Sequence, residues 1–320
     1  MNSRNKVLMF TEQHIRSIKI ITLLIVFASN FSLGQEKNIA EQLGYPKDAK
    51  LLIVHADDIG VAHSVNKATI KAFENSGISS ASIMVPCPWF GDIAAYCKLN
   101  PEKDFGLHLT LTAEWEHYKW DGVLPSSQIP SLINKEGYFY ASVEDVVKYG
   151  KPEEVEAEIR AQVQRALDVG IDVTHLDTHM RTLFSSPEFF KAYQKVGKEF
   201  NIPVFIPKDL LWNEAIAKLI DPWFIPIEYN YTVTPDTHSK DWSTFYNTIL
   251  DNLKPGLSEI VIHLAYHDDE MKAITINHPD WGSAWRQRDF DYFMSAEFKK
   301  KLKANGITLV TYREIKELKR

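Results

Sequence analysis

The run His175-Leu176-Asp177-Thr178-His179 spaces two imidazoles and a carboxylate in a way that could serve a metal ion. Side chains of a β-strand alternate between two faces, so these three polar groups would share one face. Placing them side by side away from water costs free energy unless a cation neutralises or coordinates them. We therefore expect a metal site here, or side chains that orient the ligands of one.

Two neighbouring carboxylates, Asp57 and Asp58, follow an apolar run near the start of the chain's globular part. Adjacent strand residues face opposite ways, so both can reach one site only where the strand stops, and Gly60 gives the chain freedom to turn there. Taken alone, the pair could instead form an exposed turn or cap a helix. His108, in the strand-like run 106–112, would alone more often be a hydrogen-bonded core histidine than a ligand.

These three segments together indicate more than each does separately. They end the first, third and fourth expected strands, and in a barrel of parallel strands those ends converge on one mouth. One carboxylate and two imidazoles, with coordination positions left for water and substrate, are typical of a catalytic metal site. We expect one divalent ion; zinc suits these ligands best, and magnesium, manganese, cobalt and nickel are alternatives.

Apolar, β-rich runs alternate with amphipathic helical stretches along the chain, which favours an α/β fold. The expected strands are 51–55, 79–86, 105–112, 173–179, 202–207, 224–229, 259–265 and 307–312. The expected helices run from an N-cap at Ser64 to a left-handed stop at Gly77, from Pro152 to Gly170, and over 187–201, 242–253 and 286–305. This order predicts a TIM-like (β/α) barrel, which could be irregular, as a single domain over 36–320; an open doubly wound sheet is the alternative.

Two long segments, 113–142 and 265–285, interrupt the alternation and are rich in aromatic residues. In a parallel barrel both would follow strand ends on the catalytic rim, where long loops usually serve binding. Trp115, Tyr266 and Trp281 are the candidate rim residues, with ordinary loop packing as the alternative.

The N-terminus differs from the rest of the chain. Four basic residues precede an apolar run at 20–28, which small and polar residues follow. This pattern is typical of a secretory signal peptide, and the run is shorter than the roughly 20 residues that a membrane span needs. We expect residues 1–35 to be removed on export to the periplasm or the exterior, without stable membrane insertion afterwards; an uncleaved anchor is the alternative.

The composition, 45% hydrophobic and 24% charged over 320 residues, is that of an ordinary globular protein. A formal net charge of -6, without a sustained Lys/Arg stripe, argues against a nucleic-acid partner. Cys87 and Cys97 could pair in an oxidising compartment, but two cysteines do not build a disulfide fold, and we expect buried free thiols. The sequence favours no particular oligomeric state.

The HADDIG turn, the GLHLTLT strand and the THLDTH strand, in this order and with similar separations, resemble the YdjC-like carbohydrate deacetylases, relatives of the polysaccharide deacetylase superfamily. The similarity runs from about residue 51 to the C-terminus. The resemblance implies that Asp58, His108 and His179 bind the metal and that Asp57 is the base that activates water.

The resemblance also implies that His175 and Asp177 orient the metal ligands, since a coordinating imidazole usually gives its other N–H to a carboxylate or carbonyl. The sequence departs from the family at His55, where many members have Asn, and at residues 180–182, where many continue with further histidines. The proposed metal ligands are present despite these departures, whereas the substrate of the family is less directly implied for this chain.

His263, near the end of the expected strand 259–265, is the candidate acid for the departing amine, with a core histidine as the alternative. Arg288 would orient an acid or a catalytic carboxylate, unless it is an ordinary helix-face arginine. The expected function is metal-dependent removal of an N-acetyl group from an amino-sugar-containing oligosaccharide, whose pyranose rings an aromatic rim would suit. The alternatives are a metal hydrolase of another ester, amide or phosphoester, and an inactive sugar-binding barrel.

Overall fold

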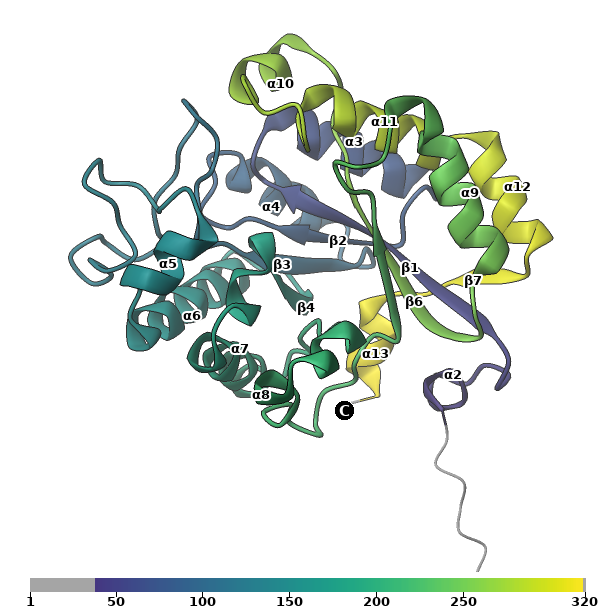
Figure 1. Ribbon diagram of the computed structural model, residues 1–320, viewed down its shortest axis with the longest axis horizontal. Coiled ribbons are helices and arrows are strands. Elements are labelled where there is room, and N and C mark those ends of the chain that lie inside the picture. The colour runs from purple at the N-terminus through teal and green to yellow at the C-terminus, as the bar shows by residue number, and fades with distance from the viewer. Residues whose placement is uncertain (1–37, 319–320) are drawn as a thin grey trace, which may run out of the picture. The chain divides into compact units, whose positions relative to one another are not determined.

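Parallel strands form the centre of the computed structural model, which describes residues 38–318 (Figure 1). They are β1 (Lys50–Ile59), β2 (Ser80–Ile83), β3 (Phe105–Leu109), β4 (Val173–Thr178), β5 (Tyr229–Thr232), β6 (Gly256–His263) and β7 (Ile307–Leu309). The order across the sheet is β4-β3-β2-β1-β6-β5, and β7 pairs with the first residues of β1. The prediction of a single-domain parallel α/β fold is confirmed.

The sheet closes into an irregular barrel through two isolated parallel bridges, Leu176 with Val204 and Pro207 with Ile227, which connect β4 to the segment before β5. The prediction of regular strands over 202–207 and 224–229 was therefore wrong. The first segment forms only isolated bridges, and in the second region regular strand pairing begins only at Tyr229. Proline has no N–H to donate to a ladder, and three prolines interrupt these segments: Pro203, Pro207 and Pro226.

Helices cover the strands on both sides, with α9, α11 and α12 above the sheet and α6 and α7 below it in Figure 1. The α-helices are α2 (Ile39–Gln42), α3 (His63–Glu74), α4 (Phe90–Leu99), α5 (Val143–Tyr149), α6 (Pro152–Asp168), α7 (Pro187–Glu199), α8 (Glu214–Ala217), α9 (Trp242–Asn252), α10 (Asp269–Ile274), α11 (Ser283–Phe293), α12 (Ala296–Ala304) and α13 (Tyr312–Glu317). Short 3-10 helices are η1 (His179–Phe184), η2 (Lys208–Trp212) and η3 (Ser239–Asp241).

Several helix boundaries differ from the sequence expectation. The single helix expected over 286–305 is two helices, because the Ser295 hydroxyl accepts a hydrogen bond from Phe298 N and begins α12. Ser64 does not cap α3: it lies inside the helix, and its hydroxyl bonds to the backbone of Tyr266. The Glu270 carboxylate instead accepts the free N–H groups of His63 and Ser64.

The predicted stop at Gly77 is displaced by one residue, because Ser76 takes the left-handed conformation with φ 55°. At the end of α6, by contrast, Gly170 has φ 88°, and the predicted glycine stop is confirmed there.

The inner face of the barrel is polar toward the carboxyl ends of the strands. Along β1, Leu52, Val54 and Ala56 belong to the main apolar core, which lies outside the barrel under the helices. The alternate residues point inward and run from apolar Leu51 and Ile53 to polar His55 and Asp57. A period of two thus places the chemistry-bearing side chains inside the barrel.

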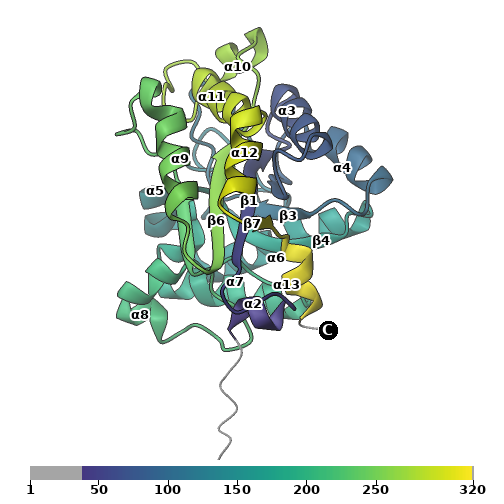
Figure 2. The same ribbon diagram turned by 90° about the vertical axis from the view of Figure 1, so that its right-hand side faces the viewer.

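The opposite end of the barrel is closed by a smaller apolar cluster. Figure 2 shows α2 and α13 together at this end. Their buried residues Ile39 and Ile315 belong to one cluster with Leu51, Ile53 and Leu257 of the barrel interior. Tyr45 also donates a 2.9 Å hydrogen bond to Glu314 Oε1, which joins the segment after α2 to α13.

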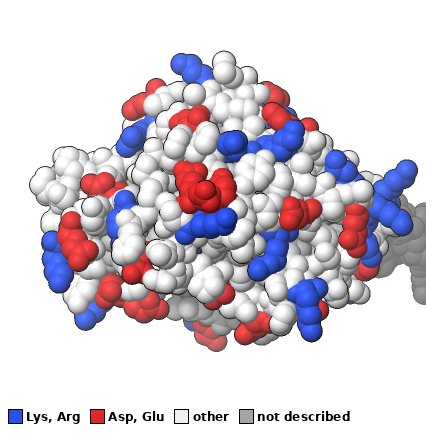
Figure 3. Space-filling model, turned by 90° about the horizontal axis from the view of Figure 1, so that it is seen from above, with Lys and Arg blue, Asp and Glu red and all other residues white. Residues whose placement is uncertain are grey.

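The described residues contain no helix that is both long and apolar enough to cross a membrane. The predicted signal peptide at 1–35 lies outside the described residues. Cys87 and Cys97 are both buried free thiols, as expected. On the face seen in Figure 3, acidic and basic side chains are interspersed without a broad area of one sign.

Candidate metal and active site

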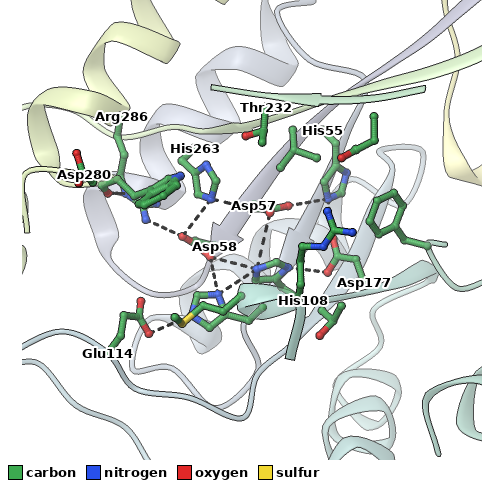
Figure 4. Close-up of a pocket in the computed structure, with 18 of the residues that line it drawn as sticks. His55, Asp57, Asp58, His108, Glu114, Asp177, Thr232, His263, Asp280 and Arg286 are labelled. Carbon is green, nitrogen blue, oxygen red and sulfur yellow. Dashed lines mark hydrogen bonds and ion pairs between the residues drawn. The ribbon is translucent and has the colours of Figure 1, made fainter. Parts of the chain in front are cut away.

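A cavity of about 510 Å³ opens at the carboxyl ends of the strands. Side chains of β1, β3, β4 and β6 converge on it, as Figure 4 shows. The strand register produces this meeting: His108 lies beside Asp177 across β3 and β4, and Asp57 lies beside His263 across β1 and β6. The structure therefore brings together the side chains that the sequence motifs singled out.

Asp58 reaches the same side as Asp57 because β1 makes a left-handed turn within its last residues, where its pairing with β2 shifts register between Ala56 and Ile59. Asp58 itself has φ 67°, and Gly60 follows with φ 90°. A non-glycine residue at positive φ is uncommon and costs free energy, and such residues cluster at functional sites. The turn aims both neighbouring carboxylates into the cavity, although strand alternation alone would separate them.

A second left-handed turn follows His179. β4 ends at Thr178, and the two residues after His179, Met180 and Arg181, have φ of 51° and 56°. Hydrogen bonds across this turn hold it: Leu183 N donates to Thr178 Oγ1, and the Thr182 hydroxyl donates to the carbonyl of His179. The backbone thus fixes His179 at the mouth of the barrel.

Three side-chain atoms form a nearly equilateral triangle at the centre of the site. His108 Nε2 and His179 Nδ1 are 3.1 Å apart, and Asp58 Oδ1 lies 3.3 Å from each of them. Ligand bonds of about 2.0–2.1 Å in a tetrahedral zinc site place neighbouring ligand atoms about 3.3 Å apart. Asp58 Oδ1 is buried and makes no directed hydrogen bond. The residues present therefore fit a divalent cation.

Each imidazole of the triangle is held from behind by a carboxylate. His108 Nδ1 lies 2.6 Å from Asp177 Oδ1, and His179 Nε2 lies 3.1 Å from Glu114 Oε2. When the outer nitrogens donate these hydrogen bonds, the inner nitrogens turn their lone pairs toward the centre, as metal ligation requires. Glu114 comes from the segment after β3, and no spacing in the sequence singled it out.

The electrostatics of the site favour positive charge at its centre. Burial opposes protonation of His108 and His179, yet the neighbouring carboxylates outweigh it: the pKa of His108 is well above its usual range and that of His179 is raised to about 9. A metal cation would replace these protons, because imidazole ligands bind metals in the neutral form.

Arg286, rather than the predicted Arg288, is the arginine that contacts a site carboxylate. Its side chain is 2% exposed and donates to Asp58 Oδ2 at 2.6 Å and to the carbonyl of Trp281 at 2.6 Å. Arg288 lies outside the cavity, with its guanidinium 5.1 Å from the centre of the Trp242 ring.

Asp58 is ionised because its neighbours outweigh its burial. Burial opposes charge on this carboxyl, but the Arg286 guanidinium and the neighbouring imidazoles of His108 and His179 hold its pKa well below the usual range. A permanently ionised oxygen is what a divalent cation needs from this ligand.

Asp57 and His263 lie side by side at the cavity, on the neighbouring strands β1 and β6. Asp57 Oδ2 lies 3.9 Å from His263 Nε2 and 3.8 Å from His108 Nε2. Burial lowers the pKa of His263 to about 4, so this imidazole is neutral at neutral pH. The backbone N of His263 donates to Asp289 Oδ2 at 3.0 Å, which fixes the end of β6 against α11.

His175 shares the inner face with Asp177, as predicted, but lies deeper in the barrel than the triangle. Its Nδ1 lies 3.0 Å from Thr174 Oγ1, and its ring stacks on Tyr312 with centroids 3.9 Å apart. Its polar partners are Thr174 and Asp104 and not His108 or His179, so it does not orient the proposed ligands. Of the two predicted orienting residues, only Asp177 contacts a proposed ligand.

Two of the three predicted rim aromatics line the cavity. Trp115 is buried, with the Arg286 guanidinium 5.6 Å from its ring centre, whereas Trp281 is 36% exposed. Trp281 stacks on Trp285 with centroids 5.1 Å apart and has φ 53°, so the backbone is strained where the ring is displayed. Tyr266 is not among the lining residues and packs on Phe290.

Other cavity-lining residues were not anticipated from the sequence. Polar groups among them come from several loops and from β5 and β6: Asn230, Thr232, Glu259, His278 and Asp280.

Comparisons with known proteins identify a matching family and similar sequences. The family model described as "YdjC-like protein" matches residues 51–304. A carbohydrate deacetylase of Thermoanaerobacter pseudethanolicus is 26% identical over 270 residues, which cover 83% of this chain and 100% of the relative. A carbohydrate deacetylase of Thermus thermophilus is 29% identical over 266 residues, covering 80% of this chain and 89% of the relative.

A solved structure has a similar fold. The crystal structure of an Enterococcus faecalis protein, described as a cellobiose-phosphate cleavage protein, superposes with a TM-score of 0.69 at 20% identity. The match covers 83% of this chain and 99% of that protein. At this level of identity the similarity concerns the fold alone.

Proposed function

Because the chain belongs to the family of YdjC-like proteins, we propose that it is a metal-dependent hydrolase that removes an N-acetyl group from an amino-sugar-containing oligosaccharide. The observation that carries the proposal is the triangle of Asp58, His108 and His179, whose three atoms are 3.1–3.3 Å apart. The relatives named carbohydrate deacetylases support the reaction type.

A divalent cation held by these three residues, with zinc favoured by the ligand types, would supply Lewis-acid activation of water and of the acetyl carbonyl. Asp177 and Glu114 keep the two imidazoles in the orientation that ligation needs. Arg286 balances the charge of Asp58 without occupying the oxygen that faces the imidazoles.

Asp57 acts as the base in this mechanism. Its Oδ2 takes a proton from the attacking water, as a carboxylate within reach of the reacting atoms can. His263 then protonates the amine as the C–N bond breaks. Since His263 is neutral at neutral pH, it must first receive that proton, and Asp57 Oδ2 at 3.9 Å is the nearby source.

The aromatic side chains of the rim support a sugar substrate. Trp281 exposes part of its ring at the cavity, with Trp285 stacked behind it. A supported aromatic face suits the apolar faces of pyranose rings. We also propose that residues 1–35 direct export, which would place the protein among extracellular or periplasmic oligosaccharides.

The test is acetate release from chitin-type oligosaccharides by the purified protein, with and without a chelator. We expect release that the chelator abolishes and that added zinc restores. Asp58→Ala, His108→Ala and His179→Ala should each lose both bound metal and activity. If the protein hydrolyses a simple ester or phosphoester but no N-acetylated sugar, the proposal is wrong and the protein is a metal hydrolase of another substrate class.

A further inference from the structure

His55 occupies the inner face of β1 just below Asp57, and the mechanism above assigns it no role. Its side chain is 1% exposed. Figure 4 shows His55 on one side of Asp57 and His263 on the other. The ring of His55 contacts four polar side chains, Asp57, Ser80, Ser82 and Asp177.

The hydrogen bonds of His55 show where its protons lie. Nδ1 is 3.0 Å from Ser80 Oγ, and that hydroxyl donates its own hydrogen to Asp104 Oδ1 at 2.6 Å. Ser80 therefore offers only a lone pair to His55. Nε2 is 2.9 Å from Asp177 Oδ2 and 3.2 Å from Asp57 Oδ1, which are both acceptors. Both ring nitrogens must donate, so the ring is an imidazolium.

The two oxygens of Asp57 have different surroundings. Oδ1 is buried, makes no directed hydrogen bond, and has the His55 ring as its neighbouring cation. Oδ2 points the other way, 3.8 Å from His108 Nε2 and 3.9 Å from His263 Nε2. One oxygen is thus available to hold the carboxylate in place, and the other faces the site.

We propose that His55 is the positioning residue for Asp57: it ties Asp57 Oδ1 to Asp177 Oδ2 and leaves Asp57 Oδ2 turned toward the substrate. Asp177 also holds His108 Nδ1 at 2.6 Å, so the same contacts fix the base relative to a metal ligand. The role of Asp57 as base rests on the proposed function, whereas the tie itself does not.

The charge on His55 is supported by its surroundings. Burial opposes it, but the hydrogen bond to Asp177 and the negative charges of Asp177 and Asp57 outweigh this and raise the pKa of His55 to about 10. The titratable groups around the ring come from every element packed on it: Asp57 on β1, Asp104 before β3, His175 and Asp177 on β4, Glu259 on β6 and Tyr312 on α13.

The first experiment measures the tie without any substrate. Zinc-loaded protein labelled with ¹⁵N-histidine is examined by NMR, and the His55 signals are assigned by their loss in His55→Asn. We expect both ring nitrogens of His55 to carry hydrogen at neutral pH, and the ring to titrate at lower pH in Asp57→Asn. A ring with one hydrogen at neutral pH, or titration unchanged in Asp57→Asn, would overturn the proposal.

The second experiment measures the consequence for turnover. His55→Asn removes the cation, and we expect bound zinc to be retained, KM to stay near the wild-type value and kcat to fall roughly 10- to 100-fold, as for a misplaced reacting group. The acidic limb of the pH–rate profile should move to higher pH, because a carboxylate without its cation binds a proton more readily.

His175→Asn is the matched control, since His175 is also a buried histidine of the inner face but does not contact Asp57. It should lower thermal stability and leave the acidic limb in place. Equal pH profiles for His55→Asn and wild type would refute the positioning role. If the wild-type protein releases no acetate from any sugar, the proposed function fails, and the NMR result still decides whether His55 ties the two carboxylates together.

Discussion

Glu114 allows the metal site to be tested without changing a proposed ligand. Its Oε2 lies 3.1 Å from His179 Nε2, and its side chain is 19% exposed. Carboxylates that hold metal-binding imidazoles contribute about 10- to 100-fold to metal affinity, which corresponds to about 1.4–2.7 kcal/mol. Because water can reach this partly exposed position and replace the lost oxygen, we expect Glu114→Ala to weaken zinc binding about tenfold, the lower end of that range.

The assay is competition for zinc against a chelator of known affinity, which yields a dissociation constant for each variant. Glu116→Ala is the matched control: Glu116 lies two residues along the same loop and contacts Asn277 at 2.6 Å instead of a proposed ligand. Asp177→Ala should cost more than Glu114→Ala, since Asp177 is less exposed and holds His108 at 2.6 Å. Wild-type affinity in Glu114→Ala would refute ligation through the inner nitrogen of His179.

The other predictions concern the base, the rim and stability. Asp57→Asn should keep zinc bound and lower kcat by roughly 10²- to 10⁴-fold; purification of this variant without metal would show that Asp57 is a ligand. Trp281→Ala should raise KM about 3- to 10-fold with little change in kcat, the size of an aromatic contact; an unchanged KM would contradict its rim role. Burial raises the pKa of Glu259 from 4.5 to about 7. The folded protein thus binds this proton more tightly than the unfolded chain, so stability falls as pH rises through that window. Glu259→Gln should flatten the dependence of stability on pH measured by calorimetry. An unchanged dependence would argue against a raised pKa of Glu259.

The inner-face residues could be predicted from the sequence because strand alternation is a local property. The spacing of His175, Asp177 and His179 placed all three on one face, and the structure has them there. What spacing could not give is depth along the barrel, which depends on the pairing of β4 with its neighbours. His175 is therefore a buried histidine beside Tyr312 and not a support of the metal ligands.

The choice of arginine shows a second limit. The expected helix began at residue 286, whereas α11 begins at Ser283. Each helical residue turns by about 100°, so Arg286 and Arg288 lie on nearly opposite sides of the helix. Which side faces the barrel depends on how α11 packs against β6, and the sequence pattern does not contain this information. Glu114 was missed for a similar reason, because an irregular loop has no period from which its direction could be read.

The apolar cluster beneath the site limits the directions from which a polymeric substrate could reach it. Leu51, Ile53 and Leu257 fill the lower barrel, and α2 and α13 seal it. A glycan therefore cannot thread through the barrel from one end to the other. Under the proposed function, the acetylated unit would enter from the rim, and acetate and the freed amine would leave by the same route. Each turnover would thus require the sugar unit to leave the cavity. This favours dissociation of the glycan after every deacetylation over processive action along the polymer.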